Sequence, residues 1–526
     1  MTHPVIPPPV RFDTNDGHFR LRPGTRIACT TNDAVPIAER FCAEMRRRCG
    51  LHLVVTGGDV GSDEPGVRIE VAAGDKLGVL RAPQGVSPSA DGAPDERYML
   101  SIGSNGAVLR AAEAVGVARG LTTLTQLLSA APPIDSGTMS VPSAHIFDYP
   151  RYAWRGLSLD LARTFLAPDE VRRVIDLLAL YKLNVLHLHL TDDQAWRLPV
   201  GRSPDSARAE AGFYSVEDLR SLVAYAEDRF VTLVPEVDTP GHASALVQMH
   251  PELDTGRNQF EFELPPGHKQ RGVWLDPGLP ATFELVEDVL AGVASMFPSP
   301  YIHIGGDEPW GMPHDLYSSY VRRVREFVRS IGKRPLGWQE SARAGLGRDD
   351  IIQYWFTDIA LAASLPPEVR AQMDTHLAMS RKEVETAVAA SVPVIVSPLS
   401  HCYLDVPYAE PSADPKQAER QDRVGFRLYS PVTVAESFDW EPSEGLGAGR
   451  AAQVAGVEAA IWCETISDFD DVTFLLLPRL AGVAHKAWSE PQSSTWLDHR
   501  DRLARHVPLW AQDDLCYFRT SAVEWK

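Results

Sequence analysis

The segment His303-Ile304-Gly305-Gly306-Asp307-Glu308 places two adjacent carboxylic acids behind a short apolar run. The two glycines allow a tight turn where a strand would meet a loop, and Pro309 is expected to hold Glu308 extended. Two carboxyl groups crowded into one cleft should differ in proton affinity, so that one stays ionised while the other holds a proton near neutral pH. Such a pair suits general acid–base chemistry, and paired carboxylic acids are the usual groups of glycoside hydrolysis.

The adjacency of Asp307 and Glu308 leaves the nucleophile of such a reaction open. A retaining glycosidase usually places two carboxylates about 5 Å apart on opposite sides of the anomeric carbon, and neighbours at one strand end cannot easily straddle a sugar. If Glu308 is the proton donor, Asp307 is therefore not expected to attack directly. Either a distant carboxylate such as Glu236 attacks, or the substrate supplies its own nucleophile.

Further polar and aromatic residues stand where other predicted strands end. They are Asp160 and Arg163; His187, His189, Asp192 and Asp193; Glu236, Asp238 and His242; Trp338; Trp355; Tyr403 and Asp405; and Trp462 and Glu464. Carboxylates accept hydrogen bonds from hydroxyl groups, and aromatic faces pack on the apolar faces of sugar rings. The set predicts a site for a neutral, hydroxyl-rich ligand.

The elements that must position these residues are short apolar strands that alternate with amphipathic helices from Arg151 onward. The predicted strands are Gly156–Asp160, Val185–Leu190, Val231–Glu236, Tyr301–Ile304, Pro335–Trp338, Ile351–Trp355, Val394–Ser397 and Val457–Trp462. This alternation indicates a (β/α)8 TIM barrel of the α/β class, whose active sites lie at the carboxyl ends of the strands. The fifth and sixth strands are too close in sequence for a full helix between them.

A doubly wound open sheet is the competing fold. Its first strand should be followed by a glycine-rich phosphate turn, but Asp160-Leu161-Ala162-Arg163 follows instead.

A smaller α+β domain at residues 1–148 is predicted to precede the barrel domain at 149–526, which ends in a helical segment. The elements predicted in the first domain are helices near 37–45 and 111–129, a strand at 67–71, and strands at 98–102 and 107–109 joined by a hairpin turn at Asn105-Gly106. The Pro- and Gly-rich stretch Gln84–Glu96 is interpreted as a surface loop.

Composition excludes several classes of protein. The chain has 526 residues, 44% of them hydrophobic and 23% charged, as in an ordinary globular protein. A formal charge of −19 opposes binding to nucleic acid or anionic membranes, and no apolar run of about 18 residues is available to span a bilayer. The N-terminus has no basic stretch followed by an apolar run, which predicts a cytoplasmic protein without a secretory signal.

In several ordered motifs the sequence resembles glycoside hydrolase family 20, the β-N-acetylhexosaminidases, over most of its length. The motifs are Arg155-Gly156 with Asp160 and Arg163, then 187–194, 238–242, 303–308, Gly337-Trp338, 403–405 and 462–464. The resemblance implies a retaining exo-β-N-acetylhexosaminidase that removes terminal β-linked N-acetylglucosamine or N-acetylgalactosamine from an oligosaccharide or glycoconjugate. It implies substrate-assisted hydrolysis, in which the 2-acetamido oxygen attacks its own anomeric carbon to form an oxazolinium intermediate. It implies no cofactor and no metal.

The resemblance also implies roles for individual residues. Glu308 corresponds to the general acid/base, Asp307 to the residue that orients the acetamido N–H, and Tyr403 to the hydroxyl that holds the acetamido oxygen. The remaining correspondences are Trp338, Trp355 and Trp462 as walls of the acetamido pocket, Arg155, Asp405 and Glu464 as groups that bind ring hydroxyls, and Asp192 and His242 as a pair that tunes the acid.

Two other classes of protein compete with this hypothesis. His187 and His189 lie two residues apart on one strand and resemble the paired metal ligands of barrel amidohydrolases, although such residues are more often hydrogen-bonded core groups. A sugar-binding protein without activity is the other class, but it has no need of the proton donor that Glu308 provides. The sequence leaves the epimer preference, the aglycone and the oligomeric state open.

Overall fold

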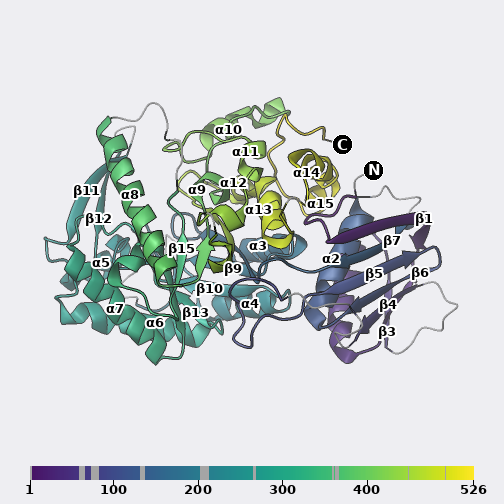
Figure 1. Ribbon diagram of the computed structural model, residues 1–526, viewed down its shortest axis with the longest axis horizontal. Helices are drawn as coiled ribbons and strands as arrows, with labels where there is room; N and C mark the ends of the chain where they lie inside the picture. Colours follow the sequence, from purple (N-terminus) through teal and green to yellow (C-terminus); the bar gives the residue numbers. More distant parts are fainter. Residues whose placement is uncertain are drawn as a thin grey trace.

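The computed structural model shows two domains side by side, with the N-terminal sheet at the right and the barrel domain filling the rest of the view (Figure 1). It describes residues 3–57, 66–72, 77, 82–130, 137–201, 212–264, 268–357, 361, 367–447, 449–491 and 493–525. Among the helices described there, none has the length and apolar character needed to cross a lipid bilayer.

The barrel is closed by parallel strands in the order β8-β9-β10-β13-β14-β15-β16-β17. These are β8 (Trp154–Asp160), β9 (Val185–His189), β10 (Thr232–Glu236), β13 (Tyr301–His303), β14 (Arg334–Trp338), β15 (Ile351–Tyr354), β16 (Val394–Val396) and β17 (Val454–Ile461). Each overlaps one of the predicted strands, so the barrel prediction is confirmed and the open doubly wound sheet is wrong. The strands are almost entirely buried because helices cover their outer faces and side chains fill the interior.

Amphipathic helices surround the barrel and bury their apolar faces against the strands. The helices of this domain are α3 (Pro168–Leu180), α4 (Val216–Glu227), α5 (Ser244–Met249), α6 (Pro280–Met296), α7 (His314–Ser330), α8 (Pro367–Ala389), α9 (Leu399–Cys402), α10 (Ala418–Arg423), α11 (Val434–Phe438), α12 (Phe469–Leu476), α13 (Arg479–Trp488), α14 (Trp496–Leu503) and α15 (Val507–Gln512). The short 3-10 helix η5 (Gln339–Ala344) joins β14 to β15, where the sequence left no room for a full helix. A hairpin of β11 (Gln259–Leu264) and β12 (His268–Val273) is inserted between β10 and α6.

The N-terminal domain is a mixed sheet in the order β1-β7-β5-β6-β4-β2-β3, packed against two helices. Its elements are β1 (Arg11–Leu21), β2 (Arg26–Cys29), α1 (Val35–Cys49), β3 (Val54–Gly57), β4 (Gly66–Val71), β5 (Tyr98–Gly103), β6 (Gly106–Ala111), α2 (Ala114–Ser129) and β7 (Met139–Asp148). The predicted hairpin and both helices are present. Strand β1 escaped prediction because it is a polar, largely exposed edge strand with an irregular register against β7.

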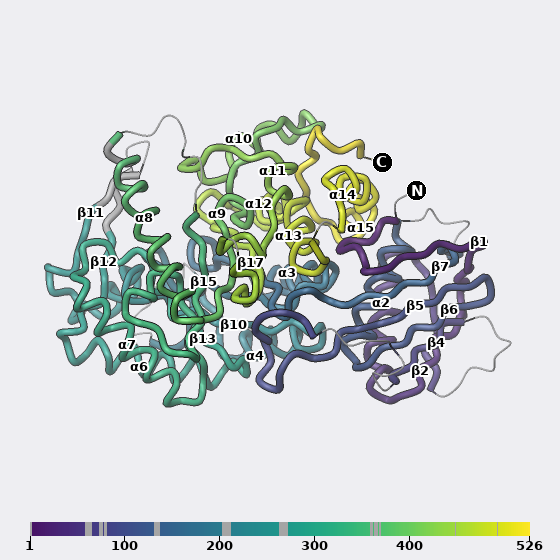
Figure 2. The backbone as a smooth tube through the Cα atoms, in the orientation of Figure 1, coloured from purple at the N-terminus to yellow at the C-terminus, as the bar shows by residue number. Residues whose placement is uncertain are grey.

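The chain ends pack against each other and against both domains. Helices α14 and α15 lie beside the first residues of the chain (Figure 2), and Nε2 of His506 lies 2.8 Å from the carbonyl oxygen of Pro4. Across the domain boundary, Nζ of Lys182 lies 2.8 Å from Oδ2 of Asp148, and both side chains are fully buried. The last strand of the first domain thus connects directly to the barrel through a buried ion pair.

The stretch Gln84–Glu96 is not only a surface loop, because its first residues close the amino-terminal end of the barrel. The N–H of Val86 donates to the carbonyl oxygen of Ala455 at 2.8 Å. Gly85 permits this approach, since a Cβ there would lie 1.9 Å from the same oxygen. Val86 covers an apolar layer to which each barrel strand contributes one residue: Trp154, Val185, Val234, Tyr301, Leu336, Ile351, Ile395 and Ala455.

Candidate active site

Asp307 and Glu308 lie just past the carboxyl end of β13, at the mouth of the barrel, where they were predicted. The turn that carries them needs glycine, because φ is 68° at Gly305 and 99° at Gly306. A Cβ on Gly305 would also lie 1.8 Å from Oδ1 of Asp238. The chain therefore turns sharply after the strand and places Asp307 and Glu308 at the barrel mouth, within 4 Å of His242.

The expectation that Pro309 holds Glu308 extended is wrong. Glu308 has φ of 45°, in the left-handed region, and the N–H of Trp310 donates to its carbonyl oxygen at 2.6 Å. Proline disfavours the right-handed helical region for the residue before it, and the turn here adopts the left-handed region instead. Backbone strain of this kind clusters at functional sites. The side chain of Glu308 remains 30% exposed.

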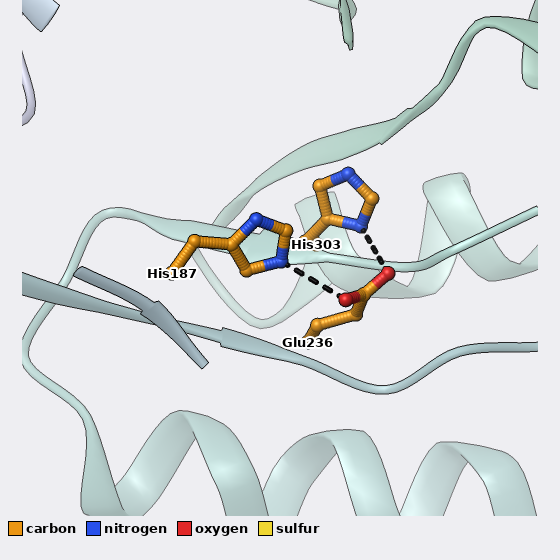
Figure 3. A group of neighbouring side chains, drawn as sticks. All are labelled: His187, Glu236 and His303. Carbon is orange, nitrogen blue, oxygen red and sulfur yellow. Dashed lines mark ion pairs between the residues drawn. The ribbon is translucent and has the colours of Figure 1, made fainter. Parts of the chain in front are cut away.

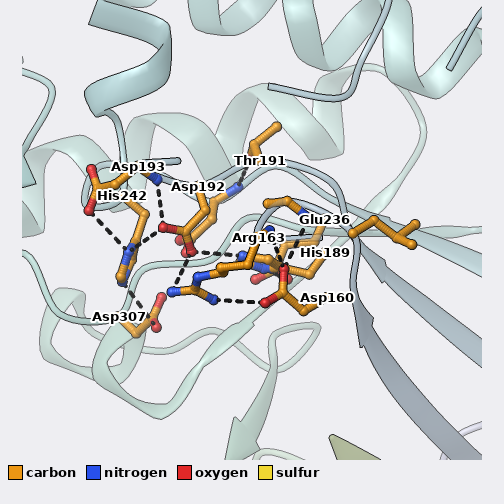
Figure 4. Close-up of polar contacts among 12 residues, drawn as sticks. Asp160, Arg163, His189, Thr191, Asp192, Asp193, Glu236, His242 and Asp307 are labelled. Atoms are coloured by element: carbon orange, nitrogen blue, oxygen red, sulfur yellow. Dashed lines mark hydrogen bonds and ion pairs between the residues drawn. The ribbon is translucent and has the colours of Figure 1, made fainter. Parts of the chain in front are cut away.

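His242 links Asp192 to the two acids, as Figure 4 shows for Asp192 and Asp307. Its Nδ1 lies 3.2 Å from Oδ1 of Asp192, whereas its Nε2 lies 3.6 Å from Oδ2 of Asp307 and 3.8 Å from Oε2 of Glu308. Burial by itself would lower the pKa of His242, but the charges of Asp192 and Asp238 raise it well above its usual range. The imidazolium form is therefore favoured between the carboxylates.

Four predicted aromatic residues meet at the barrel mouth. The rings of Trp355 and Tyr403 are stacked, with centroids 5.9 Å apart and planes inclined by 7°. The ring of Trp462 lies 5.9 Å from that of Tyr403 and 6.0 Å from that of Trp338. The Trp462 side chain is also hydrogen-bonded to the Tyr403 hydroxyl. These residues form one aromatic cluster next to Asp307, a surface suited to a small apolar group such as a methyl.

Asp405 and Glu464 lie at the same mouth and bring further carboxyl groups. Oδ1 of Asp405 accepts a hydrogen bond from the N–H of Trp462 at 3.4 Å, whereas its Oδ2 has no partner among the described residues. Burial, and then the charge of Glu464, raise the pKa of Asp405 well above its usual range. Burial likewise raises the pKa of Glu464, with Arg163 opposing that rise. Both groups have the acceptor capacity that a ligand hydroxyl requires.

Arg163 lies at this mouth, as its place after the first barrel strand predicted, although the binding of ring hydroxyls was assigned to Arg155. Its Nη2 lies 2.9 Å from Oδ2 of Asp192 and 4.0 Å from Oε1 of Glu464, and its Nη1 lies 3.4 Å from Oδ2 of Asp160 (Figure 4). Its guanidinium carbon lies 5.3 Å from the ring centroid of Trp462. Arg163 thus joins the carboxylates of three strand ends and provides donors at the barrel mouth.

The prediction that Arg155 binds ring hydroxyls is wrong. Arg155 is the second residue of β8, at the opposite end of the barrel, and its side chain is fully buried. Its Nη2 lies 2.8 and 2.9 Å from the two carboxylate oxygens of Glu96, which also pairs with Arg119 at 2.8 Å. The sequence carried the signal that distinguishes the two arginines: only Arg163 follows the carboxyl end of its strand, where this fold places its functional residues.

Replacing Arg155 with Met is therefore expected to weaken the fold without touching the barrel mouth. The free energy of unfolding should fall by about 3 kcal/mol, because the buried Glu96 loses one of its two cationic partners. Thermal or urea unfolding of the variant measures the change, with Arg220→Met on the exposed face of α4 as the control. An Arg155 variant as stable as the control would contradict this structural role.

Glu236, the other candidate nucleophile, lies fully buried below the site (Figure 3). Its Oε1 accepts a hydrogen bond from Nε1 of Trp338 at 2.8 Å, and its Oε2 lies 2.6 Å from Nδ1 of His189. His187 and His303 lie 3.1 and 3.0 Å from the same carboxylate. Although burial opposes ionisation, the three histidines hold the pKa of Glu236 well below its usual range. A carboxylate held in this way by its partners is not available to attack a sugar above it.

His187 and His189, the pair considered as metal ligands, are both hydrogen-bonded to buried carboxylates. Nδ1 of His187 lies 2.9 Å from Oε1 of Glu458, and His189 bridges Glu236 and Asp192, with Nε2 2.9 Å from Oδ2 of Asp192. Such bonds fix the orientation of each imidazole ring. The interpretation of both residues as hydrogen-bonded core groups therefore fits these contacts.

Two more residues of the site were missed. Glu340, in η5, is fully buried, and its carboxylate lies 3.3 Å from Nε1 of Trp355 and 3.3 Å from Nε2 of His376. Tyr429 packs in the aromatic cluster, where burial, and then the charges of Asp405 and Glu308, raise the pKa of its hydroxyl. The position of Glu340 two residues after Trp338 was a usable signal. Tyr429 stands in an irregular segment whose sequence gives no such signal.

A parallel barrel that gathers carboxyl groups and indole rings at the carboxyl ends of its strands is the architecture of a glycoside hydrolase. Comparison with known proteins supports this class: the glycosyl hydrolase family 20 catalytic domain matches residues 152–491, and domain 2 of the same family matches residues 2–149. The chain belongs to glycosyl hydrolase family 20 and is a glycoside hydrolase.

Named relatives agree with this assignment over nearly the whole chain. A β-N-acetylhexosaminidase of Cellulomonas fimi is 35% identical over 483 residues, which cover 87% of this chain and 90% of the relative. The structure of the GH20 β-N-acetylhexosaminidase of Streptomyces coelicolor A3(2) is 31% identical, with a TM-score of 0.81 and coverage of 99% of both chains. A mutant β-hexosaminidase of Streptomyces plicatus in complex with product (GlcNAc) has the same identity and TM-score, covering 99% of this chain and 98% of that one.

Proposed function

We propose that this protein is a retaining exo-β-N-acetylhexosaminidase that removes terminal β-linked N-acetylglucosamine or N-acetylgalactosamine by substrate-assisted hydrolysis. The observation that carries the proposal is the placement of Asp307 and Glu308 on one turn beside the aromatic cluster, while Glu236 is held below them by its partners. Two adjacent acids cannot flank an anomeric carbon as a two-carboxylate mechanism requires. An acetamido group seated among Trp338, Trp355 and Trp462 supplies the missing nucleophile.

In the first step Glu308 donates its proton to the glycosidic oxygen while the acetamido oxygen attacks the anomeric carbon. The bond to the leaving group breaks, and a cyclic oxazolinium ion forms. The carboxylate of Asp307 accepts a hydrogen bond from the acetamido N–H and stabilises the positive charge that develops there. Tyr403 donates its hydroxyl hydrogen to the acetamido oxygen and orients it toward the anomeric carbon.

In the second step Glu308, now ionised, removes a proton from a water molecule that attacks the anomeric carbon. The oxazolinium ring opens and restores the acetamido group. Each step inverts the anomeric centre, so the sugar leaves with its original β configuration. The imidazole of His242, whose Nε2 lies 3.8 Å from Oε2 of Glu308, is supported from its other side by Asp192.

The ring hydroxyls of the terminal sugar are assigned to Asp405, Glu464 and Arg163. Oδ2 of Asp405 has no partner among the described residues, and Nη2 of Arg163 lies 4.0 Å from Oε1 of Glu464 and can donate to a ligand hydroxyl at the same mouth. Arg163 therefore takes the role that the sequence analysis gave to Arg155.

A panel of aryl β-glycosides tests this function directly. The N-acetylglucosaminide and N-acetylgalactosaminide should both be hydrolysed, and the glucoside, which lacks the acetamido nucleophile, should react at least about 10³-fold more slowly. Proton NMR of the first product should show the β anomer. Comparable rates on the glucoside, or an α anomer as the first product, would argue against acetamido participation.

A further inference from the structure

Trp310 is a half-buried aromatic residue that none of the proposed roles uses. It stands two residues after Glu308, and its N–H donates to the carbonyl oxygen of Glu308 at 2.6 Å. The loop after β10 packs against the same turn, because a Cβ on Gly241 would lie only 2.7 Å from the carbonyl oxygen of Asp307. A tightly packed turn therefore holds an indole ring next to the proposed proton donor.

The packing of Trp310 differs from that of the other half-buried tryptophans. Each of those packs against an apolar core cluster: Trp440, Trp462, Trp496 and Trp525. Trp310 belongs to none of the apolar clusters formed by the residues that the structure describes. A large apolar ring that is partly exposed and adds nothing to a core has surface left for a ligand.

The indole of Trp310 rests on the imidazole of His376, which belongs to α8. The ring centroids are 5.0 Å apart and the planes are inclined by 79°, so one ring meets the other edge-on. In either arrangement of such a pair, His376 leaves at least one face of the indole uncovered. The contact therefore supports Trp310 without occupying the face on which another ring could stack.

His376 is itself held in place by buried neighbours. Its Nε2 lies 3.3 Å from Oε1 of Glu340, and its ring stacks on that of Phe356 with centroids 4.5 Å apart. The other oxygen of Glu340 accepts a hydrogen bond from Nε1 of Trp355 at 3.3 Å. One buried carboxylate thus connects the wall of the proposed acetamido pocket to the support of Trp310.

The chemistry of Glu308 indicates what lies beside this indole. A general acid must reach the oxygen that joins the terminal sugar to the leaving group, so Glu308 stands at the boundary between the two. The terminal sugar is assigned to the aromatic cluster, and Trp310 is not part of that cluster. The ring next to the acid but outside the sugar pocket is therefore placed to contact the leaving group.

We propose that Trp310 is a specificity-determining residue whose indole packs on the apolar face of a sugar ring in the leaving group, with His376 as its support. A pyranose presents a face of C–H bonds, which an indole binds through apolar burial and dispersion. The proposal deepens the proposed function and rests on it for the position of the bond that is cleaved. It implies a preference for a saccharide over a small alkyl group as aglycone.

The test compares two β-N-acetylglucosaminides, the disaccharide N,N′-diacetylchitobiose and the methyl glycoside. Both leaving groups are alcohols that need a proton from Glu308, but only the disaccharide has a second ring to stack. For Trp310→Leu we expect kcat/KM to fall about 5- to 20-fold on the disaccharide and less than about twofold on the methyl glycoside. Trp310→Phe keeps an aromatic face and should stay within about threefold of the wild type on both.

Three controls show whether the effect is specific to the leaving group. Trp496→Ala, on α14 beside the chain ends, removes another half-buried indole and should leave the ratio of the two kcat/KM values unchanged. Inhibition by N-acetylglucosamine, which fills only the terminal-sugar site, should be the same in both Trp310 variants and the wild type. Thermal unfolding checks that the variants fold.

Calorimetry supplies a readout that does not depend on turnover. In the Glu308→Gln background, the disaccharide should bind more tightly than N-acetylglucosamine, and Trp310→Leu should remove that difference. The proposal is overturned if Trp310→Leu lowers kcat/KM equally on both glycosides, since Trp310 would then act only through the turn that carries Glu308. It is also overturned if neither kcat/KM nor the difference in affinity changes. A wild type that cleaves neither glycoside nor any aryl β-N-acetylhexosaminide would instead refute the proposed function, and this proposal with it.

Discussion

Replacing Glu308 with Gln is expected to lower kcat/KM on an aryl β-N-acetylglucosaminide with a poor leaving group by about 10²- to 10⁴-fold. Glutamine keeps the shape of the side chain but can neither donate a proton to the glycosidic oxygen nor take one from water. The structure predicts little cost to folding, because the side chain is 30% exposed and its nearest charged partner, His242, lies 3.8 Å away. The loss should therefore be in the chemical steps.

The dependence of the loss on the acidity of the leaving group tests whether Glu308 is the proton donor. A substrate with a strongly acidic phenol as leaving group needs little protonation, so its bond cleavage should be much less impaired in the Glu308 variant. Glu326→Gln, on an exposed position of α7, is the matched control and should behave as the wild type. Near-normal turnover of the poor substrate by the Glu308 variant would show that another group donates the proton.

Replacing Asp307 with Ala is expected to lower kcat/KM on N-acetylated substrates by about 10²- to 10³-fold, the usual effect of removing a group that stabilises a developing charge. The acetamido nitrogen becomes cationic as the oxazolinium ion forms, and the carboxylate of Asp307 is the anion assigned to it.

Inhibition measurements separate this role from simple loss of binding. A thiazoline that mimics the cyclic intermediate should lose far more affinity for the Asp307 variant than the product N-acetylglucosamine, because the charge arises only on the way to the intermediate. The product serves as the internal control for an intact sugar site. Equal weakening of both ligands would mean that Asp307 only binds the sugar and does not stabilise the intermediate.

Much of the fold and part of the site follow from local pattern. The strands of the barrel were predictable because each is a short apolar run between loops. The location of Asp307 and Glu308 was predictable because polar residues at the carboxyl ends of parallel barrel strands all lie at the same end of the barrel. The rule that functional residues lie at the carboxyl ends of the strands also distinguishes Arg163, which follows β8, from Arg155, which lies at its beginning. The resemblance favoured the wrong one of the two because both belong to the same motif, and only their positions along the strand differ.

The sequence by itself determined the barrel, the order of its strands and the chemical character of its mouth, since these depend on hydrophobic spacing and on residues close together in the chain. The tertiary structure decided which groups meet. Val86 reaches Ala455, Arg155 reaches Glu96, and Asp238 reaches Asp307 only when the barrel closes. Burial and charge pairing depend on such distances between remote residues, which no local pattern encodes, and they separate an accessible acid such as Glu308 from one such as Glu236 that is buried and held by its partners.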